Sequence, residues 1–510
     1  MAFNRPFWAI LALALCLRLV WAWLAPQPGI GDPVHYYNVA RNVAEGRGLV
    51  VDYLWHYHYP HTDITHPEDY WMPLPALYPA VMLMLFPDSL FAALLPSVLF
   101  GVAVVALAYG IAWSIGASEQ VRWLAMLGVL CLSELMLNSA RTDTTISYVF
   151  FVGVASVSFY HGMKRNTWAW LFLAGIGAGF AHLTRQDALL LAPAFVVAMG
   201  IWRVLGERVR WRWLAVIGLG WLLIVAPYLW RNYTLFGTLL SNGSGRTAFM
   251  TSFIDQFTYG RTLDLAHYLA WGVPNIISNI ITMGLANVWT MVSTLDVVLP
   301  LFAFLGLGAL IVHREREKGL MFVLPFVLVA GLFVSYTFIT PFHTHGGSFK
   351  KSYQLLLPFW AVLGAFAIET YVRPQRVAVI VGILGAGLSG MSALQAMRAD
   401  FDLARRFNES IIALDARLRE LGDVNGDGEI IIMTQDPFIL NYHGYRALMI
   451  PSDPLDMILE AAYRYRVDYI LLPSARPALD GFLHERQQDP RLTWKVGIKS
   501  YELLAVLPAP

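Results

Sequence analysis

The chain has 510 residues, of which 57% are hydrophobic and only 14% are charged, and its formal net charge is +1. Soluble globular proteins carry about 25% charged residues, so this composition excludes a soluble protein and places the chain in a lipid bilayer. A net charge this close to zero, without a basic stripe, excludes a nucleic-acid partner.

The first apolar segment, residues 7–25, has the position of a signal peptide. Its apolar run is long, Arg18 interrupts it, and no small-residue cleavage site follows. We therefore predict a retained membrane helix. The two cysteines, Cys16 and Cys131, both lie in apolar runs and are predicted to be packed side chains, so they do not indicate a redox compartment.

An acidic residue, Asp32, follows this first span directly. Gly31-Asp32-Pro33 is typical of a helix start, with Asp as N-cap and Pro at the first helical position. Tyr36 and its neighbours predict a short amphipathic helix in the membrane interface, ended by Gly46. Carboxylates are costly near lipid, so Asp32 is either a catalyst or a helix cap. The local sequence alone favours the cap.

The segment HYHYPHTDITHPEDYW, residues 56–71, has four histidines and three carboxylates among aromatic residues. Imidazole and carboxylate groups can hold Zn²⁺ or a harder divalent ion, although the spacing matches no standard metal site. Aromatic rings beside polar groups also suit stacking on sugars, and Tyr and His are common at membrane interfaces. A divalent metal ion and a substrate-binding surface with His56 and His58 remain alternatives.

Apolar windows long enough to cross a bilayer recur along the chain, and we predict about 11 transmembrane helices. The basic residues fall in every second loop between the spans, and therefore on one side of the membrane. The N-terminus lies on that same side, and the positive-inside rule makes it cytoplasmic. The segments 26–89 and 231–288 and the tail beyond residue 400 then face outward. The predicted spans are 7–25, 90–114, 121–139, 143–162, 167–184, 186–204, 212–230, 289–312, 319–340, 352–372 and 375–396.

The tail is predicted to be a small extracytoplasmic α/β domain over residues 399–510, after a membrane domain over residues 1–398. An amphipathic helix over 401–421 precedes strand-like runs at 429–433, 446–450 and 468–472, with a further helix over 454–464. The sequence DVNGDGE at 423–429 resembles the start of a calcium loop. Thr434 stands where that loop requires a bidentate Glu, so we predict a polar turn instead.

Charged and polar residues gather at the predicted outward ends of the spans. Basic residues there oppose the positive-inside bias, so they need a compensating negative group. A phosphorylated ligand at the outer boundary would supply one, because Lys and Arg are the usual phosphate partners. The residues are Asp32, Arg141, Asp143, Arg185, Asp187, Arg231, His343, His345, Lys350 and Lys351.

Each of these residues also has a structural interpretation. Arg141 with Asp143, and Arg185 with Asp187, have the spacing of charges that cap helical hairpins or form salt bridges. Arg231 follows Trp230 and suits snorkelling to the interface. Lys350 and Lys351 suit a solvated loop. The functional interpretation depends on the convergence of many such residues on one face.

An acidic residue just after the first span, followed by a short interfacial helix, resembles the GT-C superfamily of membrane glycosyltransferases. Further similar segments cover nearly the whole chain: AHLTRQDALLLAP (181–193), APYLWRNYTLFGTLL (226–240), GGSFKKSYQLLLPFWAVLGA (346–365) and MTQDPFILNYHGYRALMIPSDP (433–454). The resemblance includes glycosyltransferase family 39, the aminoarabinose transferases and the protein O-mannosyltransferases. The protein O-mannosyltransferases have an Asp-Glu pair where this chain has Asp32-Pro33. The resemblance therefore does not imply that this chain uses their acceptor or their second carboxylate.

The resemblance implies an inverting glycosyltransferase in the cell membrane that takes sugar from a polyprenyl-phosphate carrier to an extracytoplasmic lipid, glycan or protein. It implies that Asp32 is catalytic. The family's second carboxylate does not carry over, and Asp143 is our own candidate to replace it. Cations would bind the donor phosphate: Arg141, Arg231, Lys350 and Lys351. Substrate-binding candidates are Tyr36, His56, His58, Arg185, Asp187, His343, His345 and Tyr353.

Three alternative functions remain open. A transporter or flippase for a lipid-linked saccharide would show inverted repeats and polar groups at mid-membrane, which the sequence lacks. A glycan polymerase or ligase would have an arginine pair in an outward loop, which this chain matches only in part. A non-catalytic binding protein would show no transfer at all.

Overall fold

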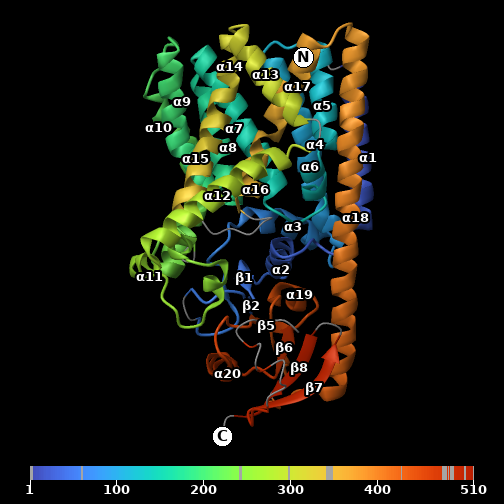
Figure 1. The fold of residues 1–510 in the computed structure, drawn as a ribbon, viewed down its shortest axis with the longest axis vertical. Coiled ribbons are helices and arrows are strands. Elements are labelled where there is room, and N and C mark those ends of the chain that lie inside the picture. The colour runs from blue at the N-terminus through green and yellow to red at the C-terminus, as the bar shows by residue number, and fades with distance from the viewer. Residues whose placement is uncertain are drawn as a thin grey trace.

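A computed structural model describes residues 4–58, 61–240, 244–296, 299–340, 348–426, 428–473, 479, 482, 488–498 and 501–508. It consists of a bundle of apolar helices with a small sheet at one end (Figure 1). The two chain termini lie at opposite ends of the long axis. The multi-pass membrane architecture expected from the composition is therefore confirmed.

Nine helical segments of the described chain are long and apolar enough to cross a membrane. Shorter apolar helices lie among them: α3 (Leu74–Leu85), α8 (Trp168–Thr184) and α13 (Leu299–Val312). Most of the buried apolar side chains in the bundle form one continuous cluster. The nine segments are α1 (Arg5–Leu24), α4 (Leu90–Ser114), α7 (Thr145–Arg165), Gln186–Val204 with α9 (Leu191–Val204), α10 (Trp213–Phe236), α12 (Val273–Ser293), Arg316–Ile339 with α14 (Arg316–Gly319) and α15 (Val323–Val334), Ser348–Tyr371 with α16 (Ser348–Tyr353) and α17 (Leu357–Tyr371), and α18 (Gln375–Leu421).

The predicted spans coincide with apolar helices, with three differences. The span predicted at 289–312 is not one helix, because α12 ends at Ser293 and α13 begins at Leu299. The span predicted at 121–139 is broken at Leu132, which has an extended backbone between α5 (Glu119–Cys131) and α6 (Ser133–Asn138). Ser133 after the break is held by hydrogen bonds to Asp296. The segment predicted as the second outward loop also contains α12, an apolar helix of 21 residues that is inclined to the bundle (Figure 1).

The predicted boundary at residue 398/399 falls inside a single helix. The 47 residues of α18 run without a break along the molecule, from the membrane bundle to the sheet (Figure 1). The amphipathic pattern at 401–421 is therefore the second half of the last long helix and not a new element. Its buried residues Ile411, Leu414 and Leu418 pack in one cluster with the sheet.

The sheet joins the tail to the first outward loop. Its strand order is β2-β5-β4-β6-β8-β7, in which the first four are parallel and the last two antiparallel to their neighbours. Because β2 comes from the loop after α2 (Asp32–Ala44), the tail and that loop share one sheet. The strands are β2 (Tyr53–Leu54), β4 (Ile431–Thr434), β5 (Arg446–Met449), β6 (Tyr469–Pro473), β7 (Leu492–Ile498) and β8 (Tyr501–Val506), and β1 (Val50–Val51) pairs separately with β3 (His66–Pro67).

The predicted strands at 429–433, 446–450 and 468–472 correspond to β4, β5 and β6. Two short helices, α19 (Pro437–Tyr442) and α20 (Leu455–Arg464), connect them, and α20 matches the predicted helix over 454–464. The predicted polar turn is also confirmed, because Asp423 accepts hydrogen bonds from the backbone of Gly426 and Gly428. A short helix in the second outward segment, α11 (Leu265–Ala270), precedes α12.

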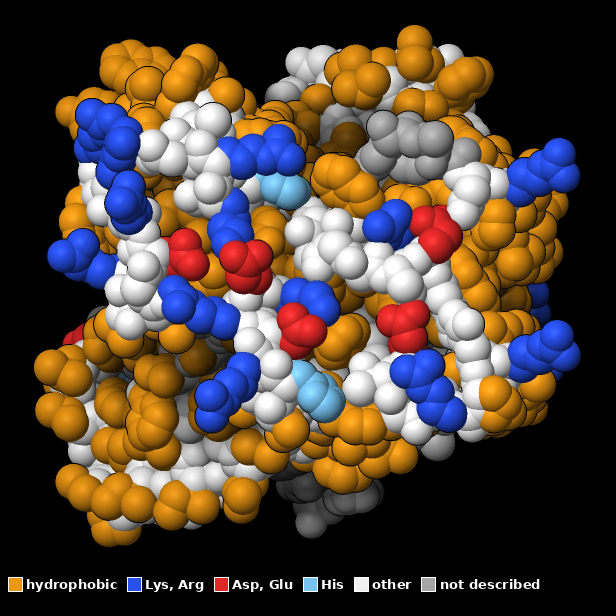
Figure 2. All heavy atoms as spheres, turned by 90° about the horizontal axis from the view of Figure 1, so that it is seen from above, with side chains coloured by type: hydrophobic (Ala, Val, Ile, Leu, Met, Phe, Trp, Pro, Cys, Tyr) orange, Lys and Arg blue, Asp and Glu red, His pale blue; other side chains and the backbone are white. Residues whose placement is uncertain are grey.

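The end of the bundle opposite the sheet is rich in basic side chains. Figure 2 shows this end from above, with Lys and Arg spread over the face among fewer Asp and Glu. Ion pairs connect its loops, from Lys164 to Glu317 at 3.3 Å and from Arg316 to Glu207 at 3.4 Å. The loops that the sequence assigned to one side of the membrane therefore lie together.

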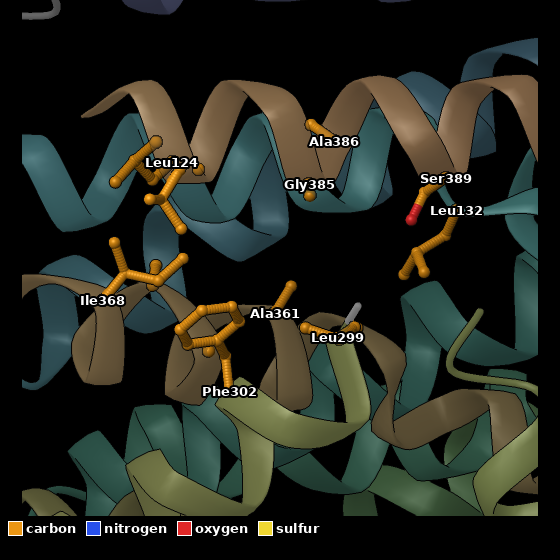
Figure 3. A pocket seen from close by; sticks show the side chains of 14 residues that line it. Leu124, Leu132, Leu299, Phe302, Ala361, Ile368, Gly385, Ala386 and Ser389 are labelled. Atoms are coloured by element: carbon orange, nitrogen blue, oxygen red, sulfur yellow. The ribbon is translucent and has the colours of Figure 1, made fainter. Parts of the chain in front are cut away.

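An apolar pocket opens among α5, α13, α17 and α18 (Figure 3). Its lining includes Leu124, Phe302, Ala361 and Gly385, and Ser389 supplies its only side-chain hydroxyl among the lining residues. No lining residue has an ionisable side chain. The pocket is therefore suited to apolar groups and cannot by itself bind a phosphate.

Candidate active site

The turn before α2 places Asp32 at the end of the bundle that carries the sheet. Gly31 has φ +70°, a conformation that favours glycine, and a Cβ on Gly29 would lie 2.6 Å from Pro33. The helix cap predicted for Asp32 is wrong, because the N-cap is Gly31 and Asp32 is the first helical residue. Among the described residues, its carboxylate accepts a hydrogen bond only from Lys351.

The Lys351 ammonium lies between two carboxylates from distant parts of the chain. Its Nζ is 3.0 Å from Asp32 Oδ2 and 2.8 Å from Asp143 Oδ2. The side chain of Asp32 is 42% exposed, whereas that of Asp143 is only 1% exposed. The structure thus joins α2, the loop before α7 and α16 at one cation, and leaves Asp32 as the accessible acid.

Asp143 is held firmly in the loop between α6 and α7. Its Oδ1 accepts hydrogen bonds from the backbone and hydroxyl of Thr144. Burial alone would raise its pKa, but the Lys351 ammonium lowers the pKa of this carboxyl to about 2. Asp143 therefore stays ionised at neutral pH. From its enclosed position Asp143 bonds the Lys351 ammonium, and it does not face the solvent as Asp32 does.

A neighbouring threonine ties this loop to the turn that carries Asp32. The Thr142 hydroxyl donates to the carbonyl of Pro33, and its backbone N–H donates to the carbonyl of Pro28 at 3.2 Å. Tyr78 of α3 bonds Ser147 of α7 at 2.8 Å from the other side. The bonds of Thr142 hold the loop of Asp143 against the turn of Asp32, and they do not involve Lys351.

Four of the five basic residues predicted to need a ligand already have carboxylate partners. Lys351 bonds Asp32 and Asp143, as described. Arg141 pairs with Asp400 of α18, Lys350 pairs with Glu134 of α6 at 2.5 Å, and Arg185 pairs with Asp187 at 3.0 Å. The expectation that these cations are uncompensated by the protein is wrong for them. Salt bridges were the structural alternative for Arg141 and Arg185. The alternative for Lys350 and Lys351, a solvated loop, is wrong, because both lie in α16 and have acidic partners.

Arg231 is the exception among these cations. Its guanidinium bonds the Asn232 side chain at 3.1 Å and the carbonyl of Leu49 at 3.2 Å, and it lies over the ring of Phe236. No carboxylate lies within ion-pair distance of it among the described residues. It connects the end of α10 to the first outward loop.

Arg185 and Asp187 hold α16 in place. Beside its carboxylate partner, Arg185 donates to the hydroxyl of Ser352 at 2.9 Å and to the carbonyl of Ser348 at 3.2 Å. Its other branch donates to the Thr144 hydroxyl at 3.1 Å. This partly buried pair connects the helix that carries Lys351 to the loop that carries Asp143.

The histidines of residues 56–71 form a second cluster. One ligand atom each from His56, His61 and Asp69 lies within 4.8 Å of the others. Burial lowers the pKa of His58 to about 4 and, with His66 beside it, the pKa of His61 to about 3. His58 stacks on the ring of Tyr70 at 5.9 Å. These imidazoles are neutral at pH 7 and enclosed by aromatic rings.

The remaining predicted substrate contacts divide between the site and the core. Burial, followed by the charges of Asp32 and Asp143, raises the pKa of Tyr36, so this tyrosine on α2 lies close to both carboxylates. Tyr353 is instead fully buried and accepts a hydrogen bond from Trp360, which gives it a structural role. His343 and His345 lie outside the described residues.

Two acidic residues near the site were missed from the sequence. Glu134 partners Lys350, and its position inside a predicted span was a usable signal, since an acid there is costly. Glu68 pairs with His35 of α2 at 3.0 Å. Burial raises the pKa of Glu68, but this histidine and backbone hydrogen bonds lower it to about 2. Nothing in the spacing of Glu68 and His35 predicts their contact, because it depends on how the loop folds back.

Residues 65–230, about a third of the chain, match the profile of the dolichyl-phosphate-mannose-protein mannosyltransferase family. A search of the curated proteins finds no match to this sequence. Solved structures of membrane glycosyltransferases match the fold along most of the chain.

The structure of ArnT from Cupriavidus metallidurans bound to undecaprenyl phosphate superposes with a TM-score of 0.61 and 12% identity, covering 99% of this chain and 99% of that one. The archaeal oligosaccharyltransferase AglB from Archaeoglobus fulgidus, in complex with an inhibitory peptide and a dolichol-phosphate, gives 0.58 and 11%, covering 92% and 69%. The oligosaccharyltransferase of the same organism, in complex with Zn and sulfate, gives 0.60 and 13%, covering 91% and 68%. At these identities the similarity establishes the fold.

Proposed function

We propose that this chain, a member of the GT-C superfamily of membrane glycosyltransferases by its fold and its family match, transfers a sugar from a polyprenyl-phosphate carrier to an acceptor outside the cytoplasm. One observation supports this most strongly. An accessible carboxylate, Asp32, bonds a partly buried ammonium, that of Lys351, at the end of an apolar helix bundle. A lipid-linked sugar would present its phosphate at this boundary while its chain stays among the helices.

The chemistry proposed is an inverting displacement at the anomeric carbon. The acceptor hydroxyl attacks that carbon, the bond to the carrier phosphate breaks, and the hydroxyl proton passes to Asp32. Oδ2 of Asp32 is bonded to Lys351, while no described residue bonds Oδ1, so Oδ1 is the oxygen that accepts the proton. The carrier leaves as the polyprenyl phosphate, whose developing charge needs nearby cations.

Lys350 and Arg231 are the proposed phosphate-binding cations. The side chain of Lys350 is 32% exposed, and it belongs to the same helix as the site lysine. Arg231 has no carboxylate partner among the described residues and therefore retains its full charge for a ligand. Arg141 remains a weaker proposal, because its guanidinium is already neutralised by α18.

A divalent ion does not fit between the two carboxylates as the structure places them. The Lys351 ammonium lies within hydrogen-bond distance of both, in the position where an ion bridging them would be bound. The proposed transfer step therefore uses the side chains of the protein alone at Asp32 and Asp143.

The proposed orientation has the basic face in the cytoplasm and the sheet outside. The basic loops that the ion pairs Lys164–Glu317 and Arg316–Glu207 join support it through the positive-inside rule. The site at Asp32 is then at the outer boundary of the cell membrane, with the N-terminus cytoplasmic and the C-terminal sheet extracytoplasmic.

The function is tested with the full chain in liposomes that contain a polyprenyl-phosphate sugar with a labelled sugar. We expect the label to appear on an added acceptor lipid, glycan or protein, with release of one polyprenyl phosphate for each sugar transferred. Donor that crosses the bilayer intact would instead show a flippase. Products with several labelled repeats would show a polymerase, and no change of the donor with any acceptor would contradict the proposal.

A pair of variants tests the role of Lys350. If Lys350 binds the donor phosphate, it must leave Glu134, so the two negative groups compete for one cation. We expect Lys350→Ala to raise the KM for the donor by about 10-fold, as loss of a charged hydrogen bond of roughly 1.5 kcal/mol would. Glu134→Gln is expected to lower that KM, because it removes the competitor and can still bond Gln354.

Steady-state rates at varied donor concentration measure both effects. The matched control is Lys318→Ala, which removes a lysine from another loop whose partner is Glu315, and it should leave the KM unchanged. A Glu134→Gln variant with a raised KM would show that the pair acts only as a structural bridge.

A further inference from the structure

We propose that His56, His61 and Asp69 bind a zinc-like divalent ion that fastens the first outward loop, at a site separate from Asp32. Two imidazoles and one carboxylate are ligands that Zn²⁺ prefers, and three protein ligands leave a fourth position for water. The inference does not depend on the transfer reaction.

The geometry of the three side chains suits such an ion. Their ligand atoms lie within 4.8 Å of one another, and His61 Nε2 is 3.9 Å from Asp69 Oδ2. Ligand atoms around tetrahedral zinc lie roughly 3.3–3.5 Å apart, given bonds of about 2.0–2.1 Å. Closing the cluster on an ion thus requires shifts of only about 1.5 Å or less at the side-chain tips.

The electrostatics of the cluster also call for a cation. Asp69 is 4% exposed, and a buried carboxylate is costly unless it is paired. Among the described residues its only ion-pair partner is His61, at the edge of contact distance. Both ring nitrogens of the adjacent His58 are buried without a hydrogen-bond partner in the described structure. The charge of the Arg231 guanidinium also acts on Asp69, but from beyond ion-pair distance. The pocket thus combines a buried acid that lacks a close cation among the described residues with imidazole rings.

The position of the cluster shows what the ion would do. His56 follows β2 closely, and Asp69 lies five residues before α3, so an ion would tie the two ends of the loop together. The residue next to Asp69, Glu68, bonds His35 on α2. Fastening the loop would therefore also stabilise the helix that begins with Asp32.

The test is a metal titration of the full chain, purified in detergent and stripped with a chelator. We expect one Zn²⁺ or Co²⁺ per chain, visible d–d absorption bands for Co²⁺, and a higher melting temperature with Zn²⁺. His61→Gln and Asp69→Asn should each weaken binding by more than the roughly 10–100-fold that loss of an outer-shell partner costs.

Two controls locate the ion. His267→Gln alters a histidine that pairs with a carboxylate elsewhere, Asp255, and should retain the metal. Asp32→Asn should also retain it, whereas loss of binding in that variant would place the ion at the catalytic carboxylates and overturn the proposal.

X-ray absorption at zinc bound to the unmodified chain needs no variant and should show two imidazole ligands. The proposal fails if the chain binds no stoichiometric metal, if His61→Gln and Asp69→Asn bind as the unmodified chain does, or if the spectrum shows no imidazole. None of these readouts requires glycosyl transfer, so they are independent of the proposed activity.

Discussion

Replacement of Asp32 by Asn is expected to reduce sugar transfer by about 10²–10⁴-fold while the protein still folds and binds its donor. The expected loss is that of a general base, because the amide cannot accept the proton of the attacking hydroxyl. The side chain is 42% exposed, and its carboxylate has one hydrogen-bond partner among the described residues, so the fold should tolerate the change. Single-turnover transfer and donor binding, measured on the same preparation, separate the two effects.

Asp52 provides the matched control for this variant. It belongs to the same outward loop and also pairs with a single cation, Arg47, at 2.6 Å. Asp52→Asn should lose this ion pair and keep transfer within a few-fold. If Asp32→Asn transfers sugar at the rate of the unmodified chain, Asp32 is not the base and the proposed mechanism is wrong.

Replacement of Lys351 by Met is expected to abolish transfer and also to destabilise the protein. The change removes the cation that neutralises Asp143, whose side chain is 1% exposed. Removal of one partner from a buried ion pair costs about 3–5 kcal/mol, because the other charge remains buried without compensation. Thermal unfolding of the purified protein measures the loss of stability, and transfer by the fraction that remains folded measures the loss of activity.

A second substitution separates these two roles of Lys351. In the double variant Lys351→Met with Asp143→Asn, the buried negative charge at position 143 is also removed. We therefore expect most of the stability to return. Transfer should stay low, because the double variant still lacks the ammonium that bonds the carboxylate of Asp32. Recovery of both stability and transfer in the double variant would show that Lys351 serves only to neutralise Asp143.

The sequence predicts the tail and the first outward loop as separate units, although the two share one sheet. The amphipathic period at 401–421 and the apolar run at 375–396 are both visible in the sequence, but their continuity as α18 is not. Likewise β2 is only two residues long, and its pairing with β5 depends on a partner almost 400 residues away. Local patterns predict elements, whereas pairings between distant elements are decided by packing.

The acidic partners of the basic residues at the site also lie far away in the sequence, so local patterns do not predict them. The sequence placed Arg141, Lys350 and Lys351 at one end of the bundle, and that placement is correct. It could not show that Asp400, Glu134 and the two site carboxylates lie against them. The apparent excess of positive charge disappears once the helices pack, so the phosphate-binding role of these residues becomes a narrower proposal, mainly for Lys350 and Arg231.

The amino-acid sequence by itself determined the membrane class, the approximate spans, the basic face, the strands of the tail and the position of Asp32 directly after the first span. Those features depend on hydrophobicity, charge and residues close in the chain, all of which are local. Only the tertiary structure decided that Asp32 is not a helix cap, that Lys351 joins it to Asp143, and that His56, His61 and Asp69 converge. Each of these depends on contacts between segments far apart in sequence, where a side chain finds its partner only after the helices have packed.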